Sequence, residues 1–504
     1  MSDLHSDASV RRARIVIIGG GFSGIGMAVR LRQQGITDFV ILERASAIGG
    51  TWRDNSYPGC ACDVQSVLYS FSFAPNPDWS RTYSQQPEIW AYLQRCVRDF
   101  DVGRHIVFDA NVTSAAWDDD AQQWTVTTTE QRWLADVVVM ASGPLSDPVM
   151  PSIDGLELFA GTTFHSSRWD HACDLRGKRV AVIGTGASAI QFVPKIQPVV
   201  GRLDLFQRTP PWVLPRKDKA IPEWRRALYR TIPLVQRAER AMVYAGREAL
   251  HFPFRHMSAA GIVEWEAKRH LRRQISDPAL RARLVPSYRI GCKRILVSDD
   301  YYPSLQQPNV SVVTDAITSI VPAGVVTADG LTHAADVIIL GTGFRATDPP
   351  LASVVVGRDG RSLADAWRGS PQAYMGTSHV GFPNFFFLLG PNTALGHSSV
   401  MLMVEAQIDH ALSVLQLMEA RGAGAVEPDA DAQRRYVAAI DVRLAATTWN
   451  SGGCRSWYLD VTGRNSTLWP DGVGAFRRTV ATAQSDDYHF TARHRSAPTV
   501  TAAL

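Results

Sequence analysis

The feature that most constrains this fold is a strand, a glycine-rich loop and a helix that occur together twice. In the first copy the strand is residues 14–18 and the loop 19–24, and a helix pattern follows. In the second copy the strand is residues 179–183 and the loop 184–189. Both strands are rich in Val and Ile, which is typical of strands buried on both faces of a parallel sheet. The repeat therefore predicts an α/β chain with two related, Rossmann-like units.

The first loop reads G-x-G-x-x-G, and each glycine has a physical use. One allows the tight turn, one lets the backbone approach a pyrophosphate, and one lets the helix pack closely on the strand. Glu43 follows the next strand, about 20 residues after the loop. A carboxylate at this place accepts hydrogen bonds from the hydroxyl groups of a ribose. The alternative is a glycine turn in an unrelated α/β domain. The whole pattern favours dinucleotide binding, with expected contacts at Gly19, Gly21, Phe22, Ser23, Gly24 and Glu43.

A second glycine pair follows this acid and favours a flavin over NAD, because the backbone must stay close to a longer cofactor. Expected contacts here are Gly50, Thr51, Trp52, Tyr57 and Asp63. Cys60 and Cys62 form a C-x-C pair that suggests a redox dithiol as an alternative. Flavin-dependent disulfide reductases space their cysteines differently and have the first one where Trp52 stands. The spacing therefore argues against a redox role for the pair.

The second loop reads G-x-G-x-x-A, and its next strand ends in Gln207-Arg208-Thr209 rather than in an acid. A cation at this place favours the 2′-phosphate of NADP over the free hydroxyl of NAD. The alternative is an ordinary surface arginine. We expect NADPH to bind here, with contacts at Gly184, Thr185, Gly186, Ser188, Ala189, Arg208 and Thr209.

The remaining strands and helices predict how the two units are interleaved. Residues 136–143 and 336–343 have one form, a strand followed by a turn of small residues, and residues 382–392 return to the first sheet. An Arg-rich helical stretch interrupts the second unit; its basic faces suit solvent, or else a membrane or a partner. The expected division is a tail at 1–13, the FAD unit at 14–150 and 346–483, the NADP unit at 151–210 and 289–345, an insertion at 211–288, and a tail at 484–504.

Bulk properties exclude several classes of protein. The 504 residues carry a net charge of only +4, which gives no reason to expect nucleic acid as a partner. The start of the chain lacks the apolar run of a signal peptide, and no stretch approaches the ~18 apolar residues of a membrane span. Six scattered cysteines fit a cytoplasmic protein with reduced thiols. The oligomeric state stays open.

The stretch FAGTTFHSSRWD, residues 159–170, lies between the two units and carries a family resemblance. It matches F-x-G-x-x-x-H-x-x-x-W-[PD] at every defined position: Phe159, Gly161, His165, Trp169 and Asp170. On this motif and the two loops, the chain resembles the type I Baeyer–Villiger monooxygenases, a group of class B flavoprotein monooxygenases. The resemblance covers residues 14–476. Arg345 departs from it, since many members have Asp there.

The resemblance implies roles that spacing alone leaves open. By spacing, Lys293 and Arg294 suit either a phosphate or the flavin; by resemblance, Arg294 is the catalytic arginine and Lys293 joins Arg208. Asp63 would pair with Arg294, and Trp457 would contact the nicotinamide cofactor. Asn392, which ends the returning strand, is a further expected contact. His165 is expected at the domain junction rather than as an acid or base, and His397 as a loop or cap residue rather than a base.

The implied chemistry uses FAD, NADPH and O₂. Reduced flavin and O₂ form a C4a-peroxyflavin, and the charged guanidinium of Arg294 would stabilise its anion for attack on a carbonyl. A ketone then gives an ester or lactone, and aldehyde oxidation is a related outcome. The first alternative is a flavin monooxygenase that oxidises sulfur or nitrogen of a small substrate such as a sulfide. The second is a nucleotide-binding sensor without turnover.

Overall fold

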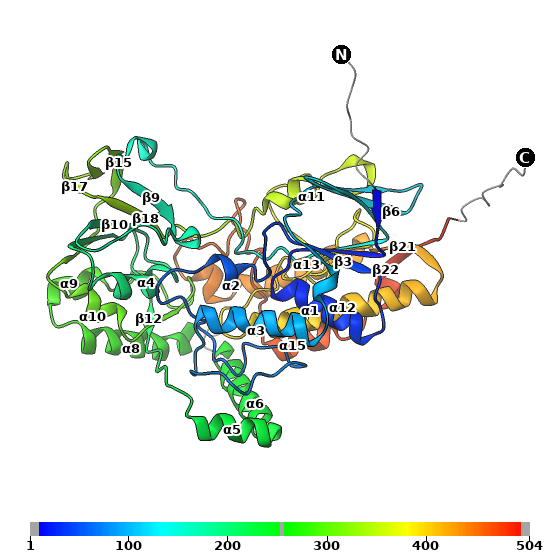
Figure 1. Ribbon diagram of the computed structural model, residues 1–504, viewed down its shortest axis with the longest axis horizontal. Helices are drawn as coiled ribbons and strands as arrows, with labels where there is room; N and C mark the ends of the chain where they lie inside the picture. The colour runs from blue at the N-terminus through cyan, green and yellow to red at the C-terminus, as the bar shows by residue number, and fades with distance from the viewer. Residues whose placement is uncertain (1–9, 253–256, 495–504) are drawn as a thin grey trace, which may run out of the picture.

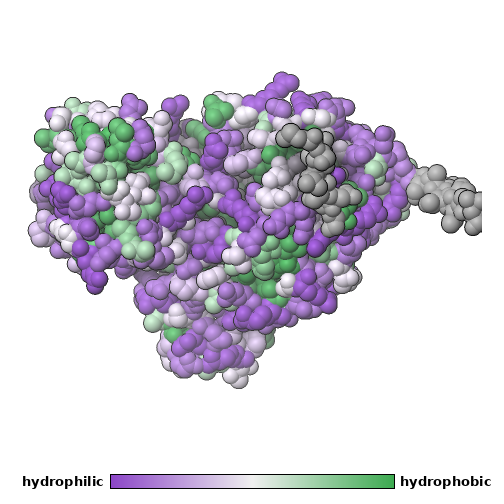
Figure 2. All heavy atoms as spheres, turned by 45° about the horizontal axis from the view of Figure 1, so that its top comes forward, coloured by the Kyte–Doolittle hydropathy of each residue, from purple (hydrophilic) through white to green (hydrophobic). Residues whose placement is uncertain are grey.

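The computed structural model describes residues 10–252 and 257–494. Two sheet-containing units lie side by side, with the second unit on the left of Figure 1 and the first on the right. A pair of helices, α5 and α6, projects below them. The face in Figure 2 is mostly hydrophilic, with apolar side chains in scattered patches.

The first unit is built on a parallel sheet with the strand order β20-β8-β2-β3-β4. Its strands are β2 (Ile15–Ile18), β3 (Phe39–Leu42), β4 (Ile106–Val107), β8 (Val137–Met140) and β20 (Phe385–Phe387). The late strand β20 joins this sheet, as the sequence predicted, and it pairs there with β8. Segments about 250 residues apart in the chain therefore complete one sheet.

Alternation along β2 shows how this sheet is covered. Ile15 and Ile17 belong to one apolar cluster, together with residues of the helices α1 (Phe22–Gln33), α3 (Gln86–Asp99) and α12 (Val400–Ala420). Val16 and Ile18 belong to another, formed with a second sheet of strand order β1-β7-β6-β5-β19. That sheet consists of β1 (Val10–Arg12), β5 (Val112–Asp118), β6 (Gln123–Thr128), β7 (Arg132–Ala135) and β19 (Val355–Val356). The sheet is thus buried on both faces, which explains its unbroken apolar strands.

Helix α12 is long and apolar enough to cross a membrane, but 67% of its most apolar stretch is buried inside the protein. It packs against α1 and α15 (Val473–Val480). Its hydrophobicity is therefore accounted for by the core. The other C-terminal helices are α13 (Ala430–Ala445) and α14 (Thr448–Ser451), and α11 (Leu363–Trp367) precedes them.

The second unit repeats the plan with the parallel strand order β14-β11-β10-β18-β9. These strands are β9 (Thr162–His165), β10 (Arg179–Ile183), β11 (Arg202–Phe206), β14 (Val310–Val313) and β18 (Val337–Leu340). β18 lies beside β10 as β8 lies beside β2. Short helices α4 (Ala189–Ile196) and α10 (Tyr301–Leu305) accompany the sheet, and a three-stranded antiparallel sheet adjoins it: β15 (Ile317–Val321), β16 (Gly324–Thr327) and β17 (Thr332–Ala334).

The insertion into the second unit is helical, as expected. It contains α5 (Glu223–Thr231), α6 (Pro233–Ala249), α8 (Met257–Gln274) and α9 (Pro278–Arg283). α5 ends before Pro233, because proline cannot donate the next backbone hydrogen bond. A short parallel pair, β12 (Val213–Leu214) with β13 (Leu296–Val297), closes the insertion at its base.

Both expected tails need correction. Val10–Arg12 form β1, which pairs with β7, and Arg11 lies over the ring of Trp133. At the other end, β22 (Tyr488–Ala492) pairs with β21 (Ala423–Pro428). Residue 488 is a buried tyrosine, so this segment is anchored rather than free. Residues 1–9 and 495–504, the rest of the expected tails, lie outside the described residues.

Candidate active site

Two glycines of the first loop, Gly19 and Gly24, are packed too tightly to carry a side chain. Gly19 has φ +110°, a conformation that favours glycine. A Cβ on Gly24 would lie 1.9 Å from the carbonyl oxygen of Gly19, so α1 could not stay this close to β2. Gly21 faces Gly50, and a Cβ on Gly21 would lie 3.8 Å from the Cα of Gly50. The space between the two residues is therefore lined by glycine alone. These positions fit the close approach of a pyrophosphate.

Glu43 is held in place by three donors around this loop. The backbone N–H of Gly20 donates to its Oε2 at 2.7 Å, and that of Ala45 to its Oε1 at 3.0 Å. Arg53 Nη1 donates to Oε1 at 2.9 Å. The carboxylate is buried, beside the cavity described next. Its fixed orientation fits hydrogen bonding to a ribose. Arg53 is a supporting residue that no sequence pattern indicated.

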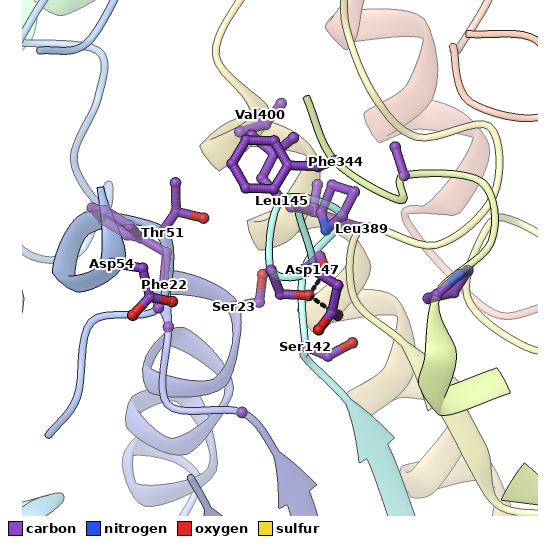
Figure 3. A pocket seen from close by; sticks show the side chains of 18 of the residues that line it. Phe22, Ser23, Thr51, Asp54, Ser142, Leu145, Asp147, Phe344, Leu389 and Val400 are labelled. Carbon is purple, nitrogen blue, oxygen red and sulfur yellow. Dashed lines mark hydrogen bonds between the residues drawn. The ribbon is translucent and has the colours of Figure 1, made fainter. Parts of the chain in front are cut away.

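One cavity of about 1070 Å³ runs along both units. Figure 3 shows Phe22, Thr51 and Asp54 on one side of it and Leu145, Phe344 and Leu389 on the other. The predicted residues that line it are Gly19, Gly21, Phe22, Ser23, Glu43, Gly50, Thr51, Trp52, Tyr57, Asp63, Gly186, Ser188, Arg294 and Trp457. Those outside its lining are Gly24, Gly184, Thr185, Ala189, Arg208, Thr209, Lys293, Asn392 and the five residues of the 159–170 motif.

Asp63 and Arg294 meet in this cavity, although they are 231 residues apart. Nε and Nη2 of Arg294 both contact Oδ2 of Asp63, at 2.8 and 2.7 Å. The side chain of Asp63 is only 26% exposed and that of Arg294 only 28%. Burial acts to raise the pKa of Asp63, but the ion pair with Arg294 outweighs it and keeps that pKa below its ordinary value. The charge of Asp63 in turn raises the pKa of Arg294, so the pair stays ionised.

The second loop is more open than the first. Gly184 has φ +112°, and a Cβ there would lie 2.4 Å from the carbonyl oxygen of Gly341, whereas a Cβ on Gly186 would meet no atom within 4 Å. Arg208 is exposed. Burial lowers the pKa of Lys293, and the positive charge of Arg208 lowers it further. Two neighbouring cations beside a glycine loop fit an anion such as a 2′-phosphate, which would relieve their repulsion.

The 159–170 motif lies at the edge of the second sheet and organises packing there. Gly161 is required by close approach, because a Cβ would lie 2.3 Å from the carbonyl oxygen of Asp336. Trp169 packs on Phe164 and Phe192, with ring centres 5.2 and 5.3 Å apart. Burial lowers the pKa of His165 to about 4, so the imidazole is neutral near pH 7.

His165 is bonded within its own turn. Its Nδ1 lies 2.8 Å from Ser167 Oγ and accepts from the Ser167 N–H at 3.1 Å. Asp170 caps the next turn, since its Oδ1 accepts from the Ala172 N–H at 3.0 Å. His165 also packs edge-on against Phe344, which lines the cavity. The motif therefore reaches the site through Phe344.

A disulfide joins Cys292 to Cys454, which corrects the expectation of reduced thiols. Cys292 immediately precedes Lys293 and Arg294, and Cys454 precedes Trp457, which is 40% exposed and lines the cavity. The bond thus holds the segment of Trp457 against the segment of Arg294. Cys60 and Cys62 remain free and buried, and burial raises the pKa of Cys60 to about 12, which keeps that thiol protonated.

Other residues differ from expectation or were missed. Asn392 is not part of the cavity lining, although its neighbour Pro391 is. Its Nδ2 donates to the carbonyls of Asn465 and Leu468 at 2.8 and 3.1 Å. Arg345 contacts Asp348 at 3.7 Å, and its side chain is 51% exposed. Gln191 of α4 is a further lining residue that no sequence pattern indicated.

Gln191 joins the second unit to the Tyr57 turn. Its Oε1 accepts from Tyr57 OH at 3.1 Å and from the Ala61 N–H at 3.2 Å, and its Nε2 donates to the Ala61 carbonyl at 2.9 Å. His397 lies in a loop, as expected; its Nε2 is 3.3 Å from Glu248 Oε1.

Comparison with known proteins places this geometry in a family. The sequence model of the flavin-binding monooxygenase-like family matches residues 12–361. A Baeyer–Villiger monooxygenase of Streptomyces coelicolor is 52% identical over 477 residues, covering 94% of this chain and 92% of the relative. The chain belongs to the Baeyer–Villiger group of this flavin-binding monooxygenase family.

Solved structures agree with this assignment. The closed crystal structure of cyclohexanone monooxygenase has a TM-score of 0.86 and 29% identity, covering 96% of this chain and 100% of that one. The structure of an OTEMO complex with FAD and NADP has a TM-score of 0.84 and 28% identity, covering 95% and 99%. This monooxygenase accordingly uses FAD and NADPH, and its two Rossmann-like units correspond to the FAD and NADP domains of this group.

Proposed function

We propose that this monooxygenase inserts one oxygen atom of O₂ beside the carbonyl of a small ketone, with Arg294 and Asp63 as the catalytic pair. The observation that carries the proposal is the ion pair between these residues at the wall of the cavity. The product is an ester or lactone. Aldehydes and sulfides are further proposed substrates, and a cytoplasmic location, where NADPH is available, stays a prediction.

The roles of the pair follow from their charges. When bound, FAD accepts a hydride from NADPH and activates O₂ for attack on the carbonyl. Arg294 presents a permanently charged guanidinium to the cavity, which stabilises negative charge that builds up on oxygen. Asp63 holds Nε and Nη2 in one geometry. Because the site is partly desolvated, this stabilisation is stronger than it would be in water.

The two loops supply binding. Glu43, which Gly20 and Arg53 already orient, would accept hydrogen bonds from the ribose hydroxyls of FAD. Arg208 and Lys293 would bind the 2′-phosphate of NADPH, consistent with the mutual effect of their charges. Trp457 would lie on the nicotinamide side of the cavity and exclude water.

Replacement of Arg294 by Ala tests the proposal. We expect the variant to keep FAD, seen in its visible absorbance, and to lose at least about a hundredfold in ester formation, since one charged stabilising donor is worth that much. Arg176→Ala, which removes a surface ion pair with Asp174, is the matched control. Products from ketones, aldehydes and sulfides are identified by mass spectrometry with NADPH and O₂ present.

Each alternative function has its own outcome in this assay. Sulfoxides or N-oxides from the wild type, without any ester, would favour the sulfur- or nitrogen-oxidising alternative. FAD binding without NADPH consumption on any substrate would favour a sensor. Ester formation at the wild-type rate by Arg294→Ala would overturn the role of Arg294.

A further inference from the structure

The short segment that carries Asp63 is approached by three arginines. Arg294 binds the carboxylate of Asp63. Arg247 Nη2 donates to the backbone carbonyl of Asp63 at 3.2 Å, and Arg216 Nη2 donates to the carbonyl of Cys62 at 3.1 Å. Asp63 follows the first glycine loop, whereas all three arginines follow the second. This segment is therefore where the insertion and the second unit contact the flavin unit beside the reacting groups.

Arg247 belongs to a row of donors along one face of α6. Gln236 Nε2 donates to the carbonyl of Asn76 at 2.5 Å, and Arg240 Nη1 donates to that of Val67 at 2.8 Å. Arg247 continues the row, since positions 4 and 11 residues further along a helix lie on nearly the same face. As the helix advances from 236 to 247, the contacted carbonyls run back from 76 to 63. The helix thus clamps the segment 63–76 along its length.

The contact of Arg247 is specific to a guanidinium. Its Nη2 donates to the Asp63 carbonyl while its Nε donates to Gln65 Oε1 at 2.8 Å. A planar fork that bonds the Asp63 backbone carbonyl and the Gln65 side chain together restrains the orientation of the backbone at Asp63. A lysine would supply the charge at a single point but could not hold both acceptors in the same geometry. The orientation of this backbone sets where the Asp63 carboxylate meets Arg294.

We propose that Arg247 is a positioning residue that aligns Asp63 with Arg294, and that α6 thereby couples the insertion to the flavin site. This inference rests on the proposed function, because it assigns Arg247 to the pair that the proposed chemistry uses. It also gives the helical insertion a role in catalysis that its basic composition did not reveal.

The test compares Arg247→Met and Arg247→Lys with Arg237→Met in the FAD-loaded enzyme. Arg237 is the matched control, since it is exposed on the same helix. We expect Arg247→Met to lower kcat for ester formation by about tenfold to a hundredfold, as small misplacements of reacting groups do, with KM for the ketone little changed. Arg247→Lys should fall between wild type and Arg247→Met, and Arg237→Met should match wild type.

Amide hydrogen exchange across residues 62–70 gives a readout besides activity. The loss of the clamp should speed exchange there in Arg247→Met, and not in the strands of the first sheet. Unchanged exchange together with an unchanged kcat would overturn the proposal. General loss of structure would appear as loss of FAD and faster exchange in β2 and β8, and would contradict a local positioning role.

A double variant separates this inference from the proposed function. If Arg247 acts through Asp63, Arg247→Met should add little to the loss caused by Asp63→Asn, whereas independent losses would multiply. Multiplying losses would overturn the proposal. If Asp63→Asn alone left ester formation intact, the proposed catalytic pair would fail, while the exchange experiment would still decide whether Arg247 clamps the segment.

Discussion

The two glycine loops share a motif but differ in how well their neighbouring side chains are ordered in the absence of a ligand. In the first, Glu43 is buried and bonded to Gly20, Ala45 and Arg53. In the second, Arg208 is exposed, and its charge lowers the pKa of Lys293. The first loop is thus organised before any ligand arrives, whereas the second keeps two mutually repelling cations.

This difference suits cofactors with different residence times. A buried, preorganised loop loses little free energy on ordering and favours a cofactor that stays bound. An open loop whose main attraction is charge favours a dinucleotide that exchanges in each catalytic cycle. The last defined residue of each motif shows the same difference in packing. Gly24 of the first loop has no room for a Cβ, whereas Ala189 of the second loop already has one.

The largest effect is expected where the first loop is tightest. Gly24→Ala would place a Cβ 1.9 Å from the Gly19 carbonyl oxygen, so α1 must move away from β2. We expect this variant to yield little folded, FAD-containing protein. Gly186→Ala in the second loop meets no atom within 4 Å and should fold normally with full FAD. The ratio of flavin absorbance to protein absorbance measures both, and full FAD in Gly24→Ala would contradict the comparison.

A smaller, selective effect is expected from Arg208→Gln. The loss of one charge-assisted contact, worth about 1.5–3 kcal/mol, should raise KM for NADPH by roughly tenfold to a hundredfold. KM for NADH, which has no 2′-phosphate, and the FAD content should hardly change. Initial rates with both nucleotides check this, with Arg176→Gln as control. An equal rise for NADPH and NADH would show that Arg208 does not bind the 2′-phosphate.

A pH-dependent effect is expected from Glu248 of α6, which joins the insertion to the first unit. Its carboxylate accepts from the N–H groups of Val473 and Gly474 at the start of α15. Burial acts to raise the pKa of Glu248, but the hydrogen bonds of His397 and of these N–H groups lower it to about 2. A lowered carboxyl pKa stabilises the folded state above the ordinary value near 4.5, and that stability is lost as pH falls towards 2.

Glu248→Gln should therefore lower the free energy of unfolding at pH 7 by about 2 kcal/mol. Denaturant unfolding at pH 7 and at pH 3 checks this, because the deficit should shrink at the lower pH. A deficit that stays constant between these pH values would mean that ionisation of Glu248 is not its source.

The smallest effect is expected from Arg345→Asp, which restores the residue that the family resemblance suggests. Arg345 is half-exposed, and its ion pair with Asp348 is long at 3.7 Å. Exposed ion pairs contribute about 0–1 kcal/mol, so the unfolding equilibrium constant and KM for NADPH should each change by less than about fivefold. A much larger change in KM for NADPH would mean that this turn takes part in cofactor binding.

Much of the fold could be predicted because its signals are local. A glycine loop between a buried strand and a helix is defined within a few residues, so both units, β20 and the helical insertion were expected from the sequence. The two terminal strands were missed because β1 is short and exposed, and because β22 forms only where β21 offers it an edge.

The site was predictable only in part. Spacing left Lys293 and Arg294 open between a phosphate and the flavin. The family resemblance supplied the pairing of Arg294 with Asp63 and placed Lys293 with Arg208. Gln191 and Arg247 carry no motif, and their partners lie 130 and 184 residues away. Side chains of this kind have no local signature, since their roles depend on which backbone groups the fold brings to them.

The sequence by itself determined that this chain binds two dinucleotides, because glycine, a buried strand and a following acid or cation act within one short segment. It also predicted the choice between the cofactors, through the second glycine pair that ends at Gly50 in one unit and Arg208 in the other. Only the tertiary structure decided that three arginines converge on the segment of Asp63, that Cys292 bonds Cys454, and that the first loop is closed while the second is open. Those features depend on distances across the fold, which no spacing along the chain defines.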